Sequence, residues 1–262
     1  MLDLFGDYVR YQGGELRMKS LLAMTDVFGV NESTTRMVAA RMRREGWFEA
    51  RPVGRETTYV LTDKALRVLN AGRERIFRRS AEPWESQWHM VIYTVPESDR
   101  PTRDRLRKGL SWLGFGPLAP STWISPHDRL GQVAEMFADV DTNVRLDLLT
   151  MGTQGLPQDR ELAARCWDLE ALNKDYQRFV RHYLARLPDY RAGLVTGPAA
   201  LRERMQLVHD YRLFPFRDPD LPLELLPPGW VGREVHDVFL EVHDLLREPA
   251  EQFYRQVTGA AE

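Results

Sequence analysis

Between residues 20 and 62 the spacing of the apolar positions changes twice, which predicts two helices followed by two strands. The apolar face of the first helix comprises Leu21, Leu22, Met24 and Val27. Gly29 ends this helix, because glycine adopts the left-handed conformation at least cost, and Asn31 is a suitable cap for the next one. The second helix begins at about residue 32, and its buried stripe comprises Thr35, Val38, Ala39 and Met42.

A hairpin follows the second helix. Gly46 ends that helix, and short strands are expected at Trp47–Ala50 and Thr57–Leu61, around a turn at residues 51–56. Helix, turn, helix and hairpin in this order predict a winged helix-turn-helix. Such a unit places its second helix in the DNA major groove, while the hairpin reaches the flanking phosphates or the minor groove.

The side chains expected to face DNA are those opposite the buried stripe and those beside the hairpin tip. On the helix they are Ser33, Arg36, Met37, Ala40, Arg41 and Arg44, and on the hairpin they are Arg51 and Arg55. A solvated helix beside a charged hairpin is the alternative, since many proteins that never bind DNA contain one.

The distribution of charge favours DNA binding. Residues 1–80 hold 15 Lys and Arg against 10 Asp and Glu, a net charge of +5. The remaining 182 residues hold 21 against 28, a net charge of −7, so the chain's −2 conceals a basic first third on an acidic body.

After the hairpin the pattern predicts a helix at residues 63–79 and then an alternating arrangement of strands and helices. Strands are expected at residues 88–95, within 114–125 as a pair, and at 144–151; helices are expected at 100–113 and 129–138. The order β-α-β-β-α-β indicates a small ferredoxin-like unit.

From Leu156 onwards the pattern is helical. One long helix, with Asp168 as its cap, has a continuous apolar face: Leu169, Leu172, Tyr176, Phe179, Val180, Tyr183, Leu184 and Leu187. Pro198 opens another helix, and Pro249 is expected to kink or split the last one. On that last helix, His236 and His243 are two turns apart, too distant to share a metal ion, and a solvated face is expected for both.

The chain is therefore expected to be an α+β protein of three domains. They are a winged helix-turn-helix DNA-binding domain at residues 1–80, a ferredoxin-like central domain at 81–155, and a helical C-terminal dimerisation and effector domain at 156–262. A single cysteine, Cys166, excludes an intramolecular disulfide. No apolar run reaches membrane-spanning length, and the first residues are acidic where a signal peptide is basic, so a cytoplasmic location is expected.

Several blocks in the same order resemble the phenylacetic acid degradation repressor family (PaaX). They include GDYVRYQGG, the segment GWFEARPVGRETTYVLT, WHMVIYTVPE, LGFGPLAPSTWISP, CWDLEALNKDYQRFVRHY and LVHDYRLFPFRDPDLPLELLPPGW. This resemblance spans nearly the whole chain. It implies a homodimeric bacterial repressor that binds double-stranded operator DNA of a catabolic operon and is released by an aryl-coenzyme A thioester, typically phenylacetyl-CoA.

The resemblance also raises an enzyme hypothesis, because the family's central domain is similar in fold to small CRISPR-associated nucleases. Those nucleases bind their metal through an aspartate just after the first strand, whereas this chain reads Tyr93-Thr94-Val95-Pro96-Glu97 there. No nucleophile elbow, GxGxxG or phosphate loop is present either. We therefore expect no enzyme, no metal and no cofactor.

An acyl-CoA effector needs aromatic walls and basic groups. Residues offering that mixture are Trp123, Trp167, Tyr176, Arg181, His209, Tyr211, Arg212, Phe214 and Phe216, although aromatic residues at helical spacing can equally be core. A homodimer is expected because one winged helix reads few base pairs, with its interface mainly in the helices after Cys166. The alternative to a repressor is a protein-interaction or architectural module without an effector.

Overall fold

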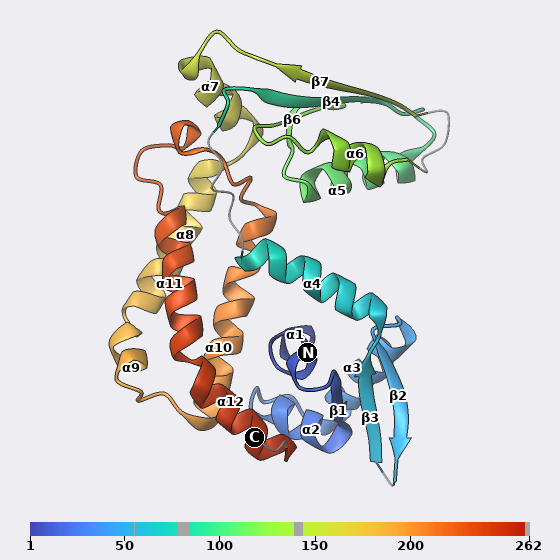
Figure 1. Ribbon diagram of the computed structural model, residues 1–262, viewed down its shortest axis with the longest axis vertical. Coiled ribbons are helices and arrows are strands. Elements are labelled where there is room, and N and C mark those ends of the chain that lie inside the picture. The colour runs from blue at the N-terminus through green and yellow to red at the C-terminus, as the bar shows by residue number, and fades with distance from the viewer. Residues whose placement is uncertain (55, 78–83, 139–143, 260–262) are drawn as a thin grey trace. The chain divides into compact units, whose positions relative to one another are not determined.

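The computed structural model describes residues 1–54, 56–77, 84–138 and 144–259 (Figure 1). The chain forms two compact units. The first, here called the N/C unit, contains Met1–Arg78, Arg178–Arg212 and Glu234–Glu262; the second, the central unit, contains Arg79–Gln177 and Leu213–Arg233. Helix and strand are mixed in an α+β chain. Among the helices of the described ranges, none is both long and apolar enough to span a membrane.

The N-terminal segment of the N/C unit contains the predicted order of two helices and a hairpin. Its elements up to residue 77 are α1 (Leu2–Asp7), the 3-10 helix η1 (Val9–Tyr11), β1 (Glu15–Arg17), α2 (Met18–Asp26), α3 (Glu32–Arg44), β2 (Phe48–Val53), β3 (Glu56–Leu61) and α4 (Asp63–Phe77). Gly29 has φ +71°, and the Asn31 side chain accepts a hydrogen bond from the Thr34 amide, so the predicted turn and cap are confirmed. The hairpin strands are longer than predicted, because β2 and β3 pair as far as Val53 and Glu56.

The same segment contains three short elements that the hydrophobic pattern did not indicate. They are α1, η1 and β1, and β1 pairs antiparallel with β3 to give the sheet order β1-β3-β2. Its burial alternates, with only Leu16 buried, but three residues are too few for this alternation to mark a strand in the sequence. Phe5 of α1 packs against Phe48 of β2, with ring centroids 4.2 Å apart, which places the first helix on this sheet.

The C-terminal helices of the N/C unit pack on its N-terminal segment. They are α9 (Leu187–Arg191), α10 (Gly197–Tyr211), α11 (Gly232–Leu245) and α12 (Arg247–Thr258). Tyr8 stacks on Tyr254 at 5.3 Å, and the Ser20 hydroxyl donates to the Val257 carbonyl at 3.4 Å. The last helix is split just before Pro249, as predicted. Part of the apolar surface that the sequence analysis assigned to a dimer interface is therefore buried within the chain.

Two expectations for these helices were wrong. His243 is only 8% exposed rather than solvated, because α11 turns this side chain towards the buried Arg204 of α10. Leu184, at the end of α8 (Leu169–Leu184), is 39% exposed, although the other positions of the predicted apolar face are buried. Asp168 accepts a hydrogen bond from the Ala171 amide and so caps α8 as predicted.

The central unit contains a four-stranded antiparallel sheet with the predicted order of elements along the chain. These are β4 (Trp88–Thr94), α5 (Arg100–Trp112), β5 (Gly116–Ala119), β6 (Thr122–Ser125), α6 (Leu130–Met136) and β7 (Arg145–Met151). The strand order is β5-β6-β4-β7. Both α5 and α6 lie on one face of the sheet, over a core that includes Val91, Leu106 and Phe137 (Figure 1).

The opposite face of this sheet is covered by the segment that follows β7. It comprises α7 (Leu156–Cys166), the first residues of α8 and the 3-10 helix η3 (Leu223–Leu225), whereas the 3-10 helix η2 (Phe214–Phe216) contacts α5 through Phe216 and Trp112. A second core forms here, around Trp88, Ile124, Leu162 and Leu225. The predicted three-domain division stays a prediction, and its first boundary at residue 80 lies outside the described residues.

Candidate functional site

Buried hydroxyl groups fix α3 on α2. The Oγ1 atoms of Thr25 and Thr35 are 2.7 Å apart and buried. Thr25 also donates to the carbonyls of Leu21 and Leu22 in its own helix, at 3.0 Å each, so Thr35 supplies the proton between the two threonines. Because a buried hydroxyl group needs a partner, this contact favours one position of α3 against α2.

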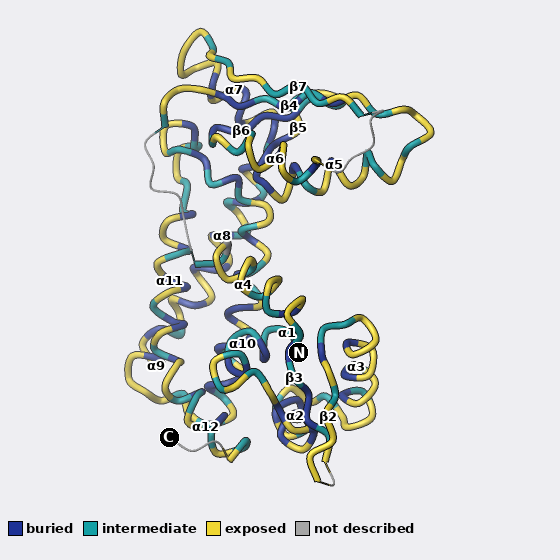
Figure 2. The backbone as a smooth tube through the Cα atoms, turned by 45° about the vertical axis from the view of Figure 1, so that its right-hand side comes forward, coloured by how far each residue is buried: buried dark blue, intermediate teal, exposed yellow. Residues whose placement is uncertain are grey.

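The face of α3 opposite this contact is exposed (Figure 2). It carries all six helix residues expected to face DNA: Ser33, Arg36, Met37, Ala40, Arg41 and Arg44. Met37, the apolar side chain on this face, is 65% exposed. The buried positions Thr35, Ala39 and Met42 alternate with these residues at helical spacing, which explains the division of the helix into two faces.

The cations on this face are paired only weakly or not at all. Arg36 bonds to Glu32 at 2.7 Å, and Arg41 lies 3.8 Å from Glu45, but all four side chains are more than half exposed. Such exposed ion pairs contribute less than about 1 kcal/mol, so little opposes their exchange for a phosphate or a base. Within the described ranges, Arg44 has no carboxylate at ion-pairing distance.

The hairpin is joined to the end of α3. The Thr62 hydroxyl donates to the Gly46 carbonyl at 2.7 Å, and Lys64 donates to the Glu45 carbonyl at 2.7 Å. Arg51 of β2 is exposed and bonds to Glu49 at 3.1 Å. The other predicted hairpin contact, Arg55, lies outside the described residues.

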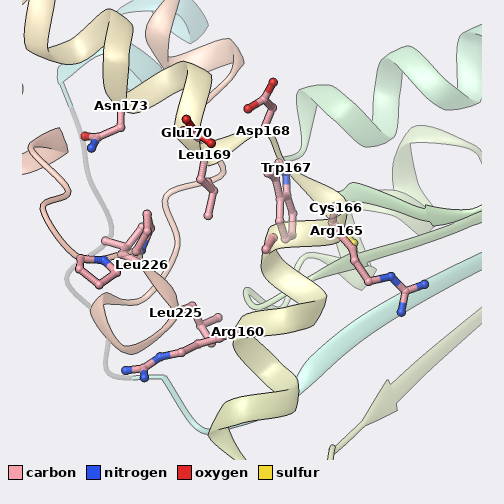
Figure 3. A pocket seen from close by; sticks show the side chains of 13 residues that line it. Arg160, Arg165, Cys166, Trp167, Asp168, Leu169, Glu170, Asn173, Leu225 and Leu226 are labelled. Carbon is pink, nitrogen blue, oxygen red and sulfur yellow. The ribbon is translucent and has the colours of Figure 1, made fainter.

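The central unit contains a cavity of about 950 Å³ between α7, the start of α8 and the segment around η3 (Figure 3). Its walls combine apolar, aromatic and charged side chains. They are formed by Arg160, Ala164, Arg165, Cys166, Trp167, Asp168, Leu169, Glu170, Asn173, Leu225, Leu226, Pro227 and Pro228. A cavity of this size accommodates a ligand the size of a nucleotide cofactor.

Trp167 is the aromatic wall of this cavity, and its position depends on a glycine. A Cβ atom at Gly116 would lie 2.5 Å from the Trp167 ring, so no other residue allows this approach. The Trp88 and Trp167 rings are stacked with centroids 6.3 Å apart, and Trp88 is itself held by a 2.8 Å hydrogen bond from its indole nitrogen to the buried Asp159. The Trp167 ring is therefore supported by Trp88 on the side that faces the sheet.

The polar groups of the cavity are mostly engaged in holding its walls. Arg160 donates from Nε to the Glu224 carbonyl at 2.7 Å, and the amide of Asn173 bonds to Gly229 and Val231 at 3.0 Å each. In Figure 3 the Arg165 guanidinium points away from the cavity. Burial raises the pKa of the Cys166 thiol to about 11, so this side chain is a neutral part of the wall.

The residues predicted to hold an effector are divided between the two units. Of those in the central unit, Trp167 alone lines the cavity, whereas Trp123 is buried in the core beneath α5 and α6. Tyr176 is buried against Phe214, with ring centroids 4.7 Å apart, and donates to Asp218 at 2.6 Å. Phe216 is 45% exposed and contacts Trp112, with centroids 5.4 Å apart.

The remaining four predicted effector residues belong to the N/C unit. Tyr211 is buried, stacks on Phe239 at 3.9 Å and hydrogen-bonds to His236 at 2.8 Å. Arg212 donates to Asp3 of α1 at 3.0 Å and, at 3.3 Å, to the exposed His209. Arg181 is exposed on α8. Within the described residues, no group of three or more His, Cys, Asp or Glu side chains is arranged to hold a metal ion.

The sequence analysis missed most of the cavity wall. Arg160 and the run Leu225-Leu226-Pro227-Pro228 lie more than 60 residues apart along the chain and are joined only by the fold. The double proline after two leucines was the one available indication, because prolines stiffen a segment and leave apolar side chains in fixed positions.

Comparisons with known proteins cover most of the chain. Residues 1–65 match the family described as PaaX-like protein, residues 81–163 the PaaX protein central Cas2-like domain, and residues 167–256 the PaaX-like protein C-terminal domain. The transcriptional repressor PaaX of Escherichia coli (strain K12) is 29% identical over 259 residues, which are 96% of this chain and 80% of that protein.

A solved structure is also similar. It is the uncharacterized protein Rv0674 from Mycobacterium tuberculosis, with 26% sequence identity, a TM-score of 0.58 and coverage of 89% of each chain. The three family matches occur in one chain, in the order and over the segments that the resemblance of its sequence blocks indicated. The chain belongs to the PaaX-like family.

Proposed function

We propose that this protein is a DNA-binding transcriptional repressor of a bacterial catabolic operon, in which α2, α3 and the β2–β3 hairpin form a winged helix-turn-helix. The observation that carries the proposal is the exposed face of α3, where Arg36, Arg41 and Arg44 surround Met37. Arginine reads guanine edges, and an apolar side chain contacts the thymine methyl group, so this face has the chemistry of base reading. The 29% identity to a transcriptional repressor supports the same function.

Binding to promoter DNA tests this proposal. The protein should retard a fragment from upstream of its own gene or the neighbouring operon, and a shuffled fragment should bind at least about a thousandfold more weakly. The affinity should fall steeply with salt, because bound arginines release counterions from the phosphates. Equal retention of both fragments would favour the alternative, a protein-interaction or architectural module.

The central unit is proposed to be ferredoxin-like. Its strands, numbered along the chain from β4 to β7, are arranged in the sheet as second, third, first and fourth, with both helices on one face. Two helices packed on one face give the sheet a hydrophobic core on that side. The sheet is then a stable support for the segment that covers its other face. In this proposal the unit frames the ligand cavity and has no catalytic role.

The effector is proposed to be an aryl-CoA thioester, such as phenylacetyl-CoA, bound in the cavity lined by Trp167. Trp167, Leu226 and the two prolines offer apolar walls for an acyl group, and Arg160 is a cation in the same lining that suits a phosphate. Of the nine residues expected from sequence at an effector site, this placement includes Trp167 and leaves out the other eight, Phe216 and Arg212 among them.

Two substitutions separate these placements. Phenylacetyl-CoA at micromolar concentration should dissociate the wild-type protein from its operator, and free coenzyme A should have little effect. Trp167→Ala should retain DNA binding and lose the response, whereas Phe216→Ala should respond normally. The reverse pattern would place the effector at η2, and no response to any acyl-CoA would remove this effector class.

We also propose that the protein acts as a homodimer, since one winged helix-turn-helix contacts too few base pairs to select one site in a genome. Leu194 and Leu213 are 71% and 54% exposed and belong to the C-terminal part, where the interface was expected. Sedimentation should give twice the chain mass of 30.4 kDa at micromolar concentration. A monomer under these conditions would contradict the dimer.

A further inference from the structure

The negative charge of the central unit conceals one basic helix, α5. The sequence of this unit holds 13 Lys and Arg against 18 Asp and Glu, a net charge of −5. Five of these cations and one acid lie within the 13 residues of α5, and the rest of the unit holds 8 against 17, a net charge of −9. The cations of α5 are Arg100, Arg103, Arg105, Arg107 and Lys108.

Neither ion pairing nor helix stability explains where these cations lie. Among the described residues, no carboxylate lies at ion-pairing distance from any of the five, although Asp104 is on the same helix. Arg103 donates to the Pro96 carbonyl at 3.3 Å, and the other four side chains are exposed. The first turn contains Arg100 and Arg103 and no acid, whereas the helix dipole favours acids there. An anion from outside the chain would account for this placement.

The outer surface of α5 suits an extended polyanion better than a small ligand. Leu106 and Leu110 are fully buried in the core under the helix, so the cations occupy its outward side (Figure 2). The helix lines neither the cavity beside Trp167 nor a smaller one of about 240 Å³ beside Trp84. Small ligands bind in concave sites, whereas these cations are spread over about 12 Å of helix. A partner with charges spaced along its length fits this arrangement.

Of the extended anions available to a protein, duplex DNA fits best. A basic helix binds anionic lipid when its apolar side is free to enter the bilayer, but the apolar side of α5 is buried. A second copy of the chain would need clustered acids, and the acids of the central unit are distributed over β7, α7, α8 and the connecting segments. DNA presents a regular row of phosphates and is the proposed partner of this protein.

We propose that α5 is a second DNA-binding surface, which contacts the phosphate backbone without reading the base sequence. It rests on the proposed repressor function, which brings the duplex to the protein. Phosphate contacts hold a protein on DNA but carry no sequence information. The helix α5 therefore adds affinity for operator and for random DNA alike, whereas α3 discriminates between them.

Removal of three charges from α5 in the full-length protein tests this role. The α5 variant is Arg100→Gln/Arg107→Gln/Lys108→Gln; these side chains are exposed, and glutamine has nearly the helix propensity of arginine and lysine. Binding to operator and to shuffled duplex is measured at several salt concentrations. On both DNAs the α5 variant should bind at least about tenfold more weakly at about 0.1 M salt, with a salt slope lower by about two to three units. The ratio of the two affinities should not change.

The control variant removes the same charge from other elements of the central unit. It is Arg145→Gln/Lys174→Gln/Arg233→Gln, with exposed side chains on β7, α8 and α11. The ion pairs of Arg145 and Lys174 are exposed, so their loss should have little effect on folding. This variant should bind both DNAs with the affinity and salt slope of wild type. Circular dichroism of both variants should match wild type, which keeps loss of binding distinct from loss of folding.

Three results on DNA would overturn the role of α5. They are an α5 variant with the affinity and salt slope of wild type, a control variant that is weakened as much as the α5 variant, and an α5 variant that loses affinity for operator alone. Sedimentation with anionic phosphatidylglycerol vesicles at about 0.1 M salt tests the lipid alternative: vesicles that retain wild type and not the α5 variant would assign the helix to a membrane.

Loss of self-association in the α5 variant and not in the control would assign the helix to a second copy of the chain. Failure of the proposed repressor function has a different signature, because wild type would then bind operator and shuffled DNA equally. The salt slope on shuffled DNA would still distinguish the α5 variant from the control, so the two failures are separate results.

Discussion

The arginines of the proposed DNA-binding surface differ in the element that carries them, and this difference predicts their roles. Arg36 lies near the start of α3, where side chains reach base edges, whereas Arg51 lies on the hairpin and pairs with Glu49. Arg36→Ala should reduce binding to operator by about 1–3 kcal/mol and reduce binding to random DNA less.

Arg51→Ala should instead weaken binding to all DNA similarly and lower the salt slope by about one unit. Binding isotherms at several salt concentrations, on operator and on shuffled DNA, separate the two classes of contact. If both variants lose specific and non-specific affinity in equal measure, the division between helix and hairpin is wrong. Arg67→Ala serves as the control, because its side chain is exposed on α4, outside α3 and the hairpin.

His243 predicts a loss of stability at acid pH. Burial is the main cause that lowers its pKa below the ordinary 6.5; the Asp7 carboxylate, 3.9 Å from Nε2, opposes this shift, and the charges of Arg204 and Arg247 add to it. The unfolded chain therefore binds the proton more readily than the folded chain. The free energy of unfolding contributed by this group is fully present above about pH 6.5 and is lost as the pH falls through the lowered pKa.

Thermal unfolding at about pH 7.5 and about pH 5.5 measures this effect. The wild-type melting temperature should fall between the two, and His243→Gln, which keeps a polar group beside Arg204, should show a smaller fall. An equal fall in both proteins would mean that other groups account for the acid sensitivity.

How far the sequence predicted the structure depends on whether a residue's role is local. Gly29, Asn31 and Asp168 act on atoms within a few positions along the chain, and all three were assigned correctly. The two faces of α3 follow from helical spacing, so the exposure of its predicted DNA-facing residues was predictable too. The burial of His243 was not, because it depends on Arg204, 39 residues away on another helix.

Secondary-structure elements and the cavity show the same difference between local and long-range contacts. The β-α-β-β-α-β order could be predicted because each strand and helix of the central unit has its own spacing of apolar residues along the chain. The strand β1 has only three residues, and its partner β3 lies about 40 positions later, so no local pattern marks it. Of nine residues expected at an effector site, only Trp167 lines the cavity in the central unit, since composition shows which side chains suit a ligand but not which of them meet.

The contact between β5 and α7 predicts how the cavity in the central unit is maintained. Gly116→Ala would place a Cβ atom 2.5 Å from the Trp167 ring and 2.8 Å from Cys166, so the ring must move. We expect a loss of about 1–3 kcal/mol in the free energy of unfolding, together with weaker binding of the proposed effector.

Gly131→Ala is the matched control for this change. It lies in α6 of the same unit, and a Cβ atom there would meet nothing within 4 Å. Alanine should leave the stability unchanged or raise it by roughly a few tenths of a kcal/mol, since Gly131 lies in the first turn of α6. Urea unfolding of both variants distinguishes them; equal stability of the two would show that Gly116 does not hold Trp167 close to the sheet.

The N-terminal segment, which carries α3, packs directly on the C-terminal helices. Tyr8 stacks on Tyr254, Arg212 bonds to Asp3, and Ser20 of α2 bonds to Val257 of α12. The segment that carries α3 thus shares one compact unit with α10 and α12. In the proposed repressor, a movement of these helices would be passed to α3 by direct side-chain packing, which a DNA-binding domain on a free linker would lack.

The central claim is that this chain recognises DNA through the exposed face of α3. The most direct measurement is the fluorescence anisotropy of labelled promoter DNA, titrated with wild type, the Ser33→Ala/Arg36→Ala double variant and Arg67→Ala. We predict a dissociation constant of roughly 10 nM or tighter for wild type and Arg67→Ala, and affinity no better than that for shuffled DNA for the double variant. A double variant that binds the promoter as tightly as wild type would contradict the claim.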